Sequence, residues 1–422
     1  MIGTTIERHP VWEFQRPASH YGKPAESAVS ANGNRVQFAD GAWALCANSG
    51  LWNVNLGYGN PAIAQAVADS LTEASYLSLF RAGHVPAVTA ARALLDVCGA
   101  ERFGRVIFST SGSAANDVVM KLARHYWVLR GEPARSLVVG LRDSYHGMTY
   151  GSFSLTGAQL GQATYGVDDR LIRHVGHDDP AEMTALLARE GHRVAAVVVE
   201  PVLGLGAQPL STEMLSTLGR LRAEYGFLLV VDEIATGFGR TGRFFASSGW
   251  SVTPDVLVTS KGLTNGTCAA SAVVVSHDVC ETYEATDAFL VHGETQAGSP
   301  SSCAAIVATI DEMHRLEACD RAVELAGQLE TALSRLSRHP LVAGTRGVSC
   351  FRALELADAD GPLGPDAIWL VVARAREAGV LIQPGIGCIL LVPSLVYTRA
   401  EVQELETNLA TALDRAADKL LT

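Results

Sequence analysis

The chain has 422 residues and a net charge of −11, with 48% hydrophobic and 18% charged residues. This balance excludes a disordered protein, which would be poor in apolar residues and rich in charge. The acidic charge argues against a nucleic-acid partner, because binding to a phosphate backbone needs basic patches. The length predicts two to three domains at roughly 150 residues each.

The eight cysteines are scattered along the chain, and no two of them form a C-x-x-C pair. This spacing favours free thiols in a reducing compartment over a disulfide framework or a metal site. Residues 1–12 have no apolar stretch typical of a signal peptide, and no apolar run reaches about 18 residues. We therefore expect a cytoplasmic protein without a membrane partner.

Strand-like apolar runs alternate with helical windows, which predicts an α/β fold with a mainly parallel sheet. Asn60 and Pro61 predict the start of a helix that runs toward Phe80. A second helix is expected over residues 113–129. Core strands are expected at residues 105–108, 137–140, 194–199, 227–231, 256–258 and 272–275. The last four runs are apolar at every position, as is typical of strands covered on both faces.

The pattern changes after a predicted helix at residues 298–316. Further helices are expected at residues 322–336, 367–377 and 400–421, and strands at residues 347–356, 380–382 and 388–392. This order predicts a large domain over residues 51–316 and a smaller α+β domain over residues 317–422. We expect residues 1–50 to pack against the smaller domain.

Two side chains with complementary chemistry follow neighbouring strands. Asp232 ends one apolar run, at the edge where open α/β sheets bind ligands, and Lys261 follows the next run. Either residue alone would be typical of a solvated loop. Together they can perform a specific task, because a lysine forms a Schiff base with an aldehyde and an aspartate pairs with a pyridinium nitrogen. These are the protein's contributions to pyridoxal phosphate (PLP) chemistry.

Two further motifs suit such a cofactor. Residues 111–113, Ser-Gly-Ser, follow a strand and open a helix, where backbone N–H groups and the helix dipole favour a phosphate. A plain helix N-cap would use the same residues. Tyr145 and His146 precede a glycine and offer a flat ring that could stack on a flat cofactor, although an ordinary loop has the same composition.

Taken together, these motifs resemble a known family. Residues 232–242, followed by Pro254-Asp255 and by residues 260–263, resemble the signature of the class III (ω-type) PLP-dependent aminotransferases. The other pieces occur in the family's order between residues 43 and 393: Ser111-Gly112-Ser113, Tyr145-His146-Gly147, Glu200-Pro201 and Thr295. Residues 235–242 are most similar to the branch that contains diaminopelargonic acid synthase. The resemblance implies a PLP-dependent transferase of fold type I.

The resemblance also implies roles for individual residues. Lys261 would be the catalytic Schiff-base lysine and proton carrier, and Asp232 would keep the ring nitrogen protonated. Thr295 would reach the phosphate of a neighbouring subunit, which implies a homodimer with shared active sites. The remaining cofactor contacts would be Gly112 and Ser113 at the phosphate, Tyr145 and Ile234 on the two ring faces, and His146 and Glu200 near the ring.

The chain departs from the family at the substrate end of the site. Many members bind the substrate carboxylate through an arginine of the last core strand, where this chain has Leu390 or, with a shifted alignment, Leu391. The glutamate that pairs with this arginine in some members corresponds to Leu205. A paired loss is physically consistent, because a buried glutamate without its arginine would be an uncompensated charge. Misalignment or drift within the family would also explain it.

We expect an acceptor ketone or aldehyde without a carboxylate beside its carbonyl, from a small molecule or a peptide, and a separate amino donor. Specific alternatives are the C-terminal ketone of a ribosomal peptide, as in daptide-type pathways, and a diaminopelargonic acid synthase-like reaction in a biosynthetic pathway. Candidate pocket walls are Trp52, Phe80 and Tyr150. Candidate cations for the donor's carboxylate are Arg81, Arg142 and Arg352.

Other functions remain open from the sequence. Mutases and racemases of the same fold use the same lysine and aspartate, and a non-enzymatic relative would retain the fold. Residues 237–242 match G-x-G-x-x-G, and Asp255 follows 18 residues after Gly237, so an NAD-dependent dehydrogenase is an alternative from another class. Residues 174–179 contain two histidines and two aspartates, but we expect a solvated turn there and no metal site.

Overall fold

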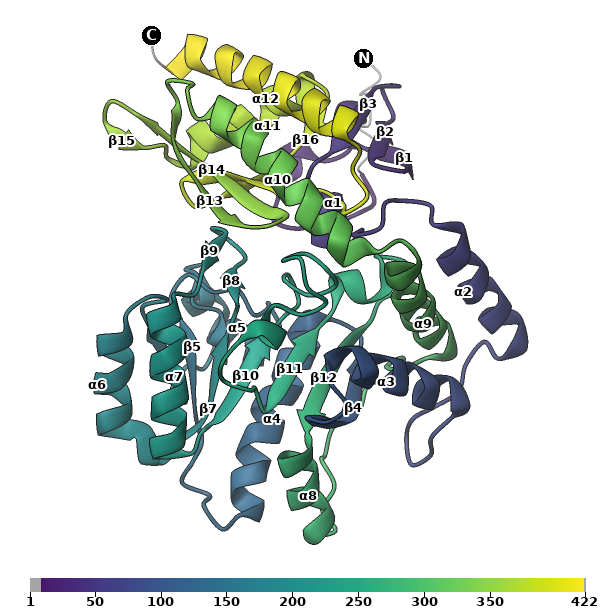
Figure 1. Cartoon of the computed structure of the whole chain (residues 1–422), viewed down its shortest axis with the longest axis vertical. Helices are drawn as coiled ribbons and strands as arrows, with labels where there is room; N and C mark the ends of the chain where they lie inside the picture. The colour runs from purple at the N-terminus through teal and green to yellow at the C-terminus, as the bar shows by residue number, and fades with distance from the viewer. Residues whose placement is uncertain (1–8, 421–422) are drawn as a thin grey trace, which may run out of the picture.

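The computed structural model describes residues 9–420, which form a larger lower part and a smaller upper part (Figure 1). The larger part is built on a seven-stranded sheet. Its strands in spatial order are β4 (Phe103–Ser109), β12 (Ser271–Ser276), β11 (Val256–Thr259), β10 (Leu228–Asp232), β7 (Val194–Val199), β5 (Leu137–Leu141) and β6 (Ile172–Val175). All neighbouring pairs are parallel except those of β12, which runs antiparallel to β11 and β4. The predicted α/β class with a mainly parallel sheet is confirmed.

Helices cover both faces of this sheet, so its central strands are buried at every position and are mostly apolar. In β10, Val230 packs in a cluster with α4 (Gly112–Leu129), whereas Val231 packs in a cluster with α6 (Pro180–Glu190) and α7 (Thr212–Tyr225). Other helices of this part are α2 (Pro61–Glu73), α3 (Val85–Cys98), α5 (Tyr150–Leu155), α8 (His277–Ala285) and α9 (Pro300–Arg315).

The smaller part contains a second sheet with the order β13 (Val342–Val348), β14 (Phe351–Asp358), β18 (Cys388–Leu391) and β17 (Gln383–Gly385), with β15 (Gly361–Pro362) paired to β14. Its helices are α10 (Ala318–Leu336), α11 (Pro365–Glu377) and α12 (Arg399–Leu420). The N-terminal strands β1 (Ala28–Asn32), β2 (Arg35–Phe38) and β3 (Trp43–Cys46) form a third sheet with β16 (Val380–Leu381). The first and last parts of the chain therefore lie together in the upper part of Figure 1.

Two local predictions are wrong, and one helix was missed. The strand expected at residues 347–356 is a hairpin, because Ser349 adopts a left-handed φ of 49° between β13 and β14. Helix α2 begins at Pro61 as expected, but it ends at Glu73, where Ala74 is extended. The sequence analysis also missed α3, whose N-cap is the imidazole of His84, an unusual capping group that accepts from the Ala87 N–H.

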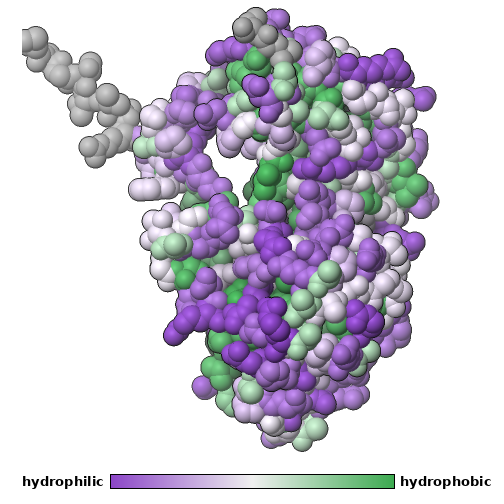
Figure 2. Space-filling model, turned by 90° about the vertical axis from the view of Figure 1, so that its left-hand side faces the viewer, coloured by the Kyte–Doolittle hydropathy of each residue, from purple (hydrophilic) through white to green (hydrophobic). Residues whose placement is uncertain are grey.

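The two parts of the molecule meet around the carboxyl ends of the parallel strands. Viewed from the side, the surface is mostly hydrophilic, and hydrophobic residues show where it is hollowed between the upper and lower parts (Figure 2). Within residues 9–420, no helix is long and apolar enough to cross a membrane.

Candidate active site

The two predicted catalytic side chains leave the sheet at one edge. Asp232 is the last residue of β10 and lies opposite Val258 of the parallel strand β11. Lys261 follows β11 and opens the short helix η6 (Lys261–Thr264), with a left-handed φ of 48°. Parallel neighbouring strands bring both residues to the edge where open α/β sheets bind ligands.

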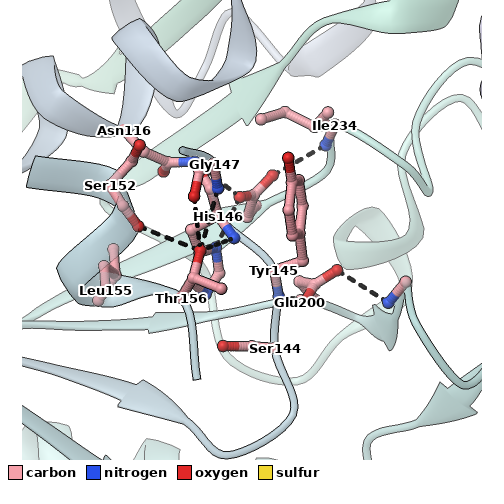
Figure 3. A network of polar contacts seen from close by, with 12 residues as sticks. Asn116, Ser144, Tyr145, His146, Gly147, Ser152, Leu155, Thr156, Glu200 and Ile234 are labelled. Atoms are coloured by element: carbon pink, nitrogen blue, oxygen red, sulfur yellow. Dashed lines mark hydrogen bonds and ion pairs between the residues drawn. The ribbon is translucent and has the colours of Figure 1, made fainter. Parts of the chain in front are cut away.

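The Asp232 carboxylate is buried and fixed by three donors, from the residues Asn116, His146 and Ile234 that Figure 3 labels. The Asn116 amide donates to Oδ2 at 2.9 Å, and Nδ1 of His146 lies 2.8 Å from the same oxygen. The Ile234 N–H donates to Oδ1 at 3.1 Å. Burial lowers the pKa of His146, but the hydrogen bond and charge of Asp232 outweigh this effect and raise it. These contacts hold a negative charge in one orientation at the end of β10.

Asn116 is a site residue that the sequence analysis missed. It lies in the second turn of α4, fully buried, and its amide also donates to the carbonyl oxygen of His146 at 2.9 Å. It therefore ties the helix to both the aspartate and the histidine. The available sequence signal is its position four residues after Gly112, one helical turn beyond the proposed phosphate-binding start of α4.

Glu200 joins two loops that border the site. Its carboxylate accepts the Tyr145 N–H at 2.8 Å and the Gly204 N–H at 2.9 Å. Burial raises the pKa of Glu200 to about 7, with His146 opposing the shift and Asp232 adding to it. Figure 3 shows this carboxylate beneath the ring of Tyr145, with Ile234 above it.

The Lys261 amine lies 4.2 Å from the centre of the Trp52 ring. Burial lowers the pKa of Lys261 to about 8, although Asp232 and Glu200 act in the opposite direction. Arg240, which is also buried, adds a smaller effect that lowers this pKa. A lysine with such a pKa is partly neutral near pH 7 and can act as a nucleophile.

The N-terminus of α4 has the features that suit an anion. The N-cap Ser111 accepts the Ala114 N–H through its Oγ, and Ser113 Oγ accepts the Met148 N–H at 3.1 Å. A Cβ on Gly112 would lie 2.7 Å from Ile234 Cδ1, so glycine is needed where the helix start approaches that side chain. A helix N-terminus, a buried carboxylate, an aromatic ring and a neutralisable amine fit the phosphate, ring nitrogen, ring face and aldehyde of PLP.

The small sheet distinguishes between Leu390 and Leu391. Leu390 packs in a cluster with Trp52, Phe351 and Ala353, whereas Leu391 faces the separate core on the other side of the sheet. A Cβ on Gly385 would lie 2.8 Å from the Leu205 carbonyl oxygen and 3.2 Å from Leu390 Cγ. The backbone carbonyl of Leu205 therefore lies near the Leu390 side chain, and Leu390 is the residue on the Trp52 side.

Most candidate cations are already engaged. Arg352 lies opposite Leu391, so it emerges on the face away from Trp52. Arg346 of β13, which the sequence analysis missed, lies on the Leu390 face and also donates to the carbonyls of Gly206 and Ile386. Arg81 has a left-handed φ of 62° and an exposed side chain. The ion pairs of the others are Arg142–Glu182, Arg346–Glu355 and Arg352–Glu330.

Three predicted site residues lie at the surface of a single chain. Phe80 and Tyr150 are 54% and 71% exposed, and Thr295 is exposed as well. The turn that carries Thr295 is attached to the start of α4, because Glu294 accepts the Thr110 N–H at 3.0 Å. Other large apolar residues that are exposed in these segments are Tyr76, Leu77, Met148, Phe289 and Val291.

The dehydrogenase alternative is wrong. Residues 237–242 form turns that lead to the short helix η5 (Ala246–Gly249), not to the helix that a dinucleotide pyrophosphate needs at this place. At residues 174–179, where we expect a solvated turn, His174 bonds the Leu155 carbonyl and Asp179 caps α6. Residues 9–420 contain no cluster of three or more side chains suited to a metal.

Comparisons with known proteins identify the family. The class III aminotransferase family model matches residues 20–413. The chain is 30% identical to putrescine–pyruvate aminotransferase of Pseudomonas aeruginosa, over 94% of this chain and 92% of that protein. It is 31% identical to acetylornithine aminotransferase of Mycolicibacterium smegmatis, over 95% and 96% of the two chains.

A solved structure gives the same result. An amine transaminase from an uncultivated Pseudomonas species, in its PLP-bound form, superposes with a TM-score of 0.91 at 30% identity, covering 96% of this chain and 99% of that one. The predicted fold type I is thereby confirmed, and the non-enzymatic alternative is excluded. The chain belongs to the class III aminotransferases and is an enzyme whose cofactor is pyridoxal phosphate.

Proposed function

We propose that the enzyme transfers an amino group to a ketone or aldehyde that has no carboxylate beside its carbonyl. The observation that carries this proposal is the position of Leu390 on the Trp52 side of the small sheet, where it packs in a cluster with Trp52, Phe351 and Ala353. Trp52 lies under the Lys261 amine, so this apolar surface leads away from the reacting nitrogen.

The residues divide the work between holding the cofactor and moving protons. When bound, PLP supplies an aldehyde that takes up the amino group and a conjugated ring that withdraws electrons. Lys261 Nζ would bind the aldehyde carbon and, once displaced by the substrate amine, would carry the proton to and from the substrate carbon. Asp232 would accept a hydrogen bond from the ring nitrogen, with Asn116 and His146 keeping its carboxylate oriented.

The remaining contacts would fix the position of the cofactor. The backbone at Gly112 and Ser113 would bind the phosphate, because the start of an 18-residue helix concentrates free N–H groups and positive potential. Tyr145 and Ile234 would lie on the two faces of the ring. Glu200 would hold the Tyr145 loop in place through the Tyr145 N–H.

The proposed choice of acceptor follows from the free-energy cost of removing a carboxylate from water. A 2-oxo acid carries its carboxylate one bond from the carbonyl, so its anion would enter the apolar end beside Leu390 without a partner. The Arg346 guanidinium on this face is already paired with Glu355. Burying an unpaired carboxylate costs several kcal/mol, whereas an alkyl or amide body gains apolar contact.

We therefore expect kcat/KM for carboxylate-free ketones and aldehydes to exceed that for 2-oxoglutarate by at least roughly tenfold, with the amino donor fixed. Leu390→Arg should narrow this ratio, because it supplies a cation on the correct face. Leu390→Met, which conserves volume and polarity, is the matched control and should leave the ratio unchanged. A wild-type preference for 2-oxoglutarate would refute the apolar-pocket proposal.

We also propose a homodimer with shared active sites. The exposed apolar side chains around the cofactor site, including Phe80 and Tyr150, support this arrangement because a single chain leaves them in water. Thr295 would then complete the phosphate site of the neighbouring subunit. Sedimentation at micromolar concentration should show a dimer, and activity in a species that sediments as a monomer would contradict the proposal.

One experiment distinguishes an aminotransferase from the mutases and racemases of the same fold. A mutase or racemase would return the amino group to the same molecule, whereas an aminotransferase passes it from one compound to another. Incubation with ¹⁵N-labelled donors and a separate acceptor measures this transfer directly. A daptide-type peptide ketone and a diaminopelargonic acid synthase-like acceptor are the two specific biosynthetic acceptors to include. The similarity to the diaminopelargonic acid synthase branch stays a prediction.

The cysteines, all free thiols, support a reducing cytoplasm as the compartment.

A further inference from the structure

Four residues lie in register across the small sheet: Arg346 of β13, Ala353 of β14, Leu390 of β18 and Gln383 of β17. Directly opposite residues of antiparallel strands project on the same face, so all four share the face that packs against Trp52. The row therefore has an ion-paired arginine at one end, small and apolar residues in the middle, and a neutral amide at the other end.

The Gln383 amide differs from its polar neighbours. Within residues 9–420, its Oε1 is buried and has no hydrogen-bond partner. The guanidinium of Arg346, at the opposite end of the row, is engaged by Glu355 and by two carbonyl groups. Buried acceptors in folded proteins are normally satisfied, so an unsatisfied one next to a substrate site indicates a missing donor.

The surroundings of Gln383 place it at the apolar end of the proposed pocket. Gly385, two residues along the same strand and on the same face, lies so close to the Leu205 carbonyl oxygen and the Leu390 side chain that a Cβ would contact both. Gln383 as a whole is half-buried while its Oε1 is buried, so Oε1 would meet a ligand only after the side-chain amide rotates. In the same cluster as Leu390, the Trp52 indole N–H is also buried without a partner among the described residues.

We propose that Gln383 is a specificity-determining residue whose Oε1 accepts a hydrogen bond from the N–H of an amide in the body of the acceptor. This inference rests on the proposed function. A secondary amide is neutral, so it can enter beside Leu390 without the desolvation penalty of a carboxylate. The N–H of the acceptor's amide can donate to Gln383 Oε1, and its carbonyl oxygen can accept from the Trp52 N–H. A carboxylate has no donor for Oε1.

The test uses two acceptors that differ in one hydrogen-bond donor: N-methylacetoacetamide and methyl acetoacetate. The holoenzyme should prefer the amide by about five- to tenfold in kcat/KM, because a site with a buried acceptor discriminates against a ligand that leaves it unpaired. Gln383→Leu should bring this ratio to about one while 4-phenyl-2-butanone stays within about twofold of wild type. Gln328→Leu is the matched control, because Gln328 of α10 also has a buried, unpartnered Oε1 but lies on another element. It should leave the ratio unchanged.

Several results would overturn the inference. An unchanged amide-to-ester ratio of kcat/KM in Gln383→Leu would do so. A fall in kcat/KM confined to 2-oxoglutarate would also do so, because it would show that the Gln383 side chain binds a carboxylate. A uniform loss on all acceptors would indicate a structural role, and Gln383→Met, with a measured melting temperature, checks that the strand still folds. If the wild-type enzyme transfers no amino group to any carbonyl compound, the proposed function itself has failed.

Discussion

Lys261→Ala is expected to abolish both the covalent attachment of PLP and essentially all amino-group transfer, because Lys261 is the lysine that follows the strand beside Asp232. The chain has four lysines, at positions 23, 121, 261 and 419, so a labelled lysine can be identified among few alternatives. After borohydride reduction of the wild-type holoenzyme, peptide mapping should find the label on Lys261. The control Lys121→Ala changes a lysine on the outer side of α4 and should retain label and activity.

The pH dependence of cofactor uptake provides a second readout of Lys261. Burial lowers the pKa of this amine to about 8, so roughly a tenth of it is neutral at pH 7. Only the neutral amine attacks an aldehyde, so the rate at which the apoenzyme takes up PLP should rise about tenfold per pH unit below pH 8 and then level off. A rate that keeps rising to about pH 10 would show an ordinary lysine, and label on another lysine would refute the assignment.

Asp232→Asn is expected to preserve the fold but to lower kcat by roughly 10²-fold or more. The carboxylate is buried and already held by Asn116 and His146, so the variant removes the charge while retaining the shape. Without the charge, nothing in this position keeps the ring nitrogen of the cofactor protonated, and an electrostatic contribution of this kind is worth about that factor.

The measurement is a single-turnover rate together with a circular dichroism spectrum, which separates a chemical defect from unfolding. Asp278→Asn, an exposed aspartate in the first turn of α8, is the matched control and should leave the rate unchanged. Near-normal turnover in the Asp232 variant would rule out the proposed role.

Much of the fold follows from local pattern. Runs such as Val194–Val199 are apolar at every position, and only strands covered on both faces by helices bury such a run completely. The errors occur where a backbone conformation decides the outcome. The turn between β13 and β14 depends on a left-handed Ser349, and the end of α2 depends on an extended Ala74, neither of which has a strong residue signal.

By itself, the sequence placed Asp232 and Lys261 at the ends of two successive strands, because each residue directly follows an apolar run. The carboxyl ends of parallel strands lie at one edge of a sheet, where ligands bind. It could not place Asn116, Arg346 or Gln383, which come from a helix and from two strands of another sheet. Their contacts depend on how α4 packs beside β10 and on the register of β13, β14, β18 and β17. Only tertiary structure decided that Leu390, and not Leu391, faces Trp52. Successive residues of a strand point to opposite faces, so the choice depends on which face of the small sheet packs against Trp52.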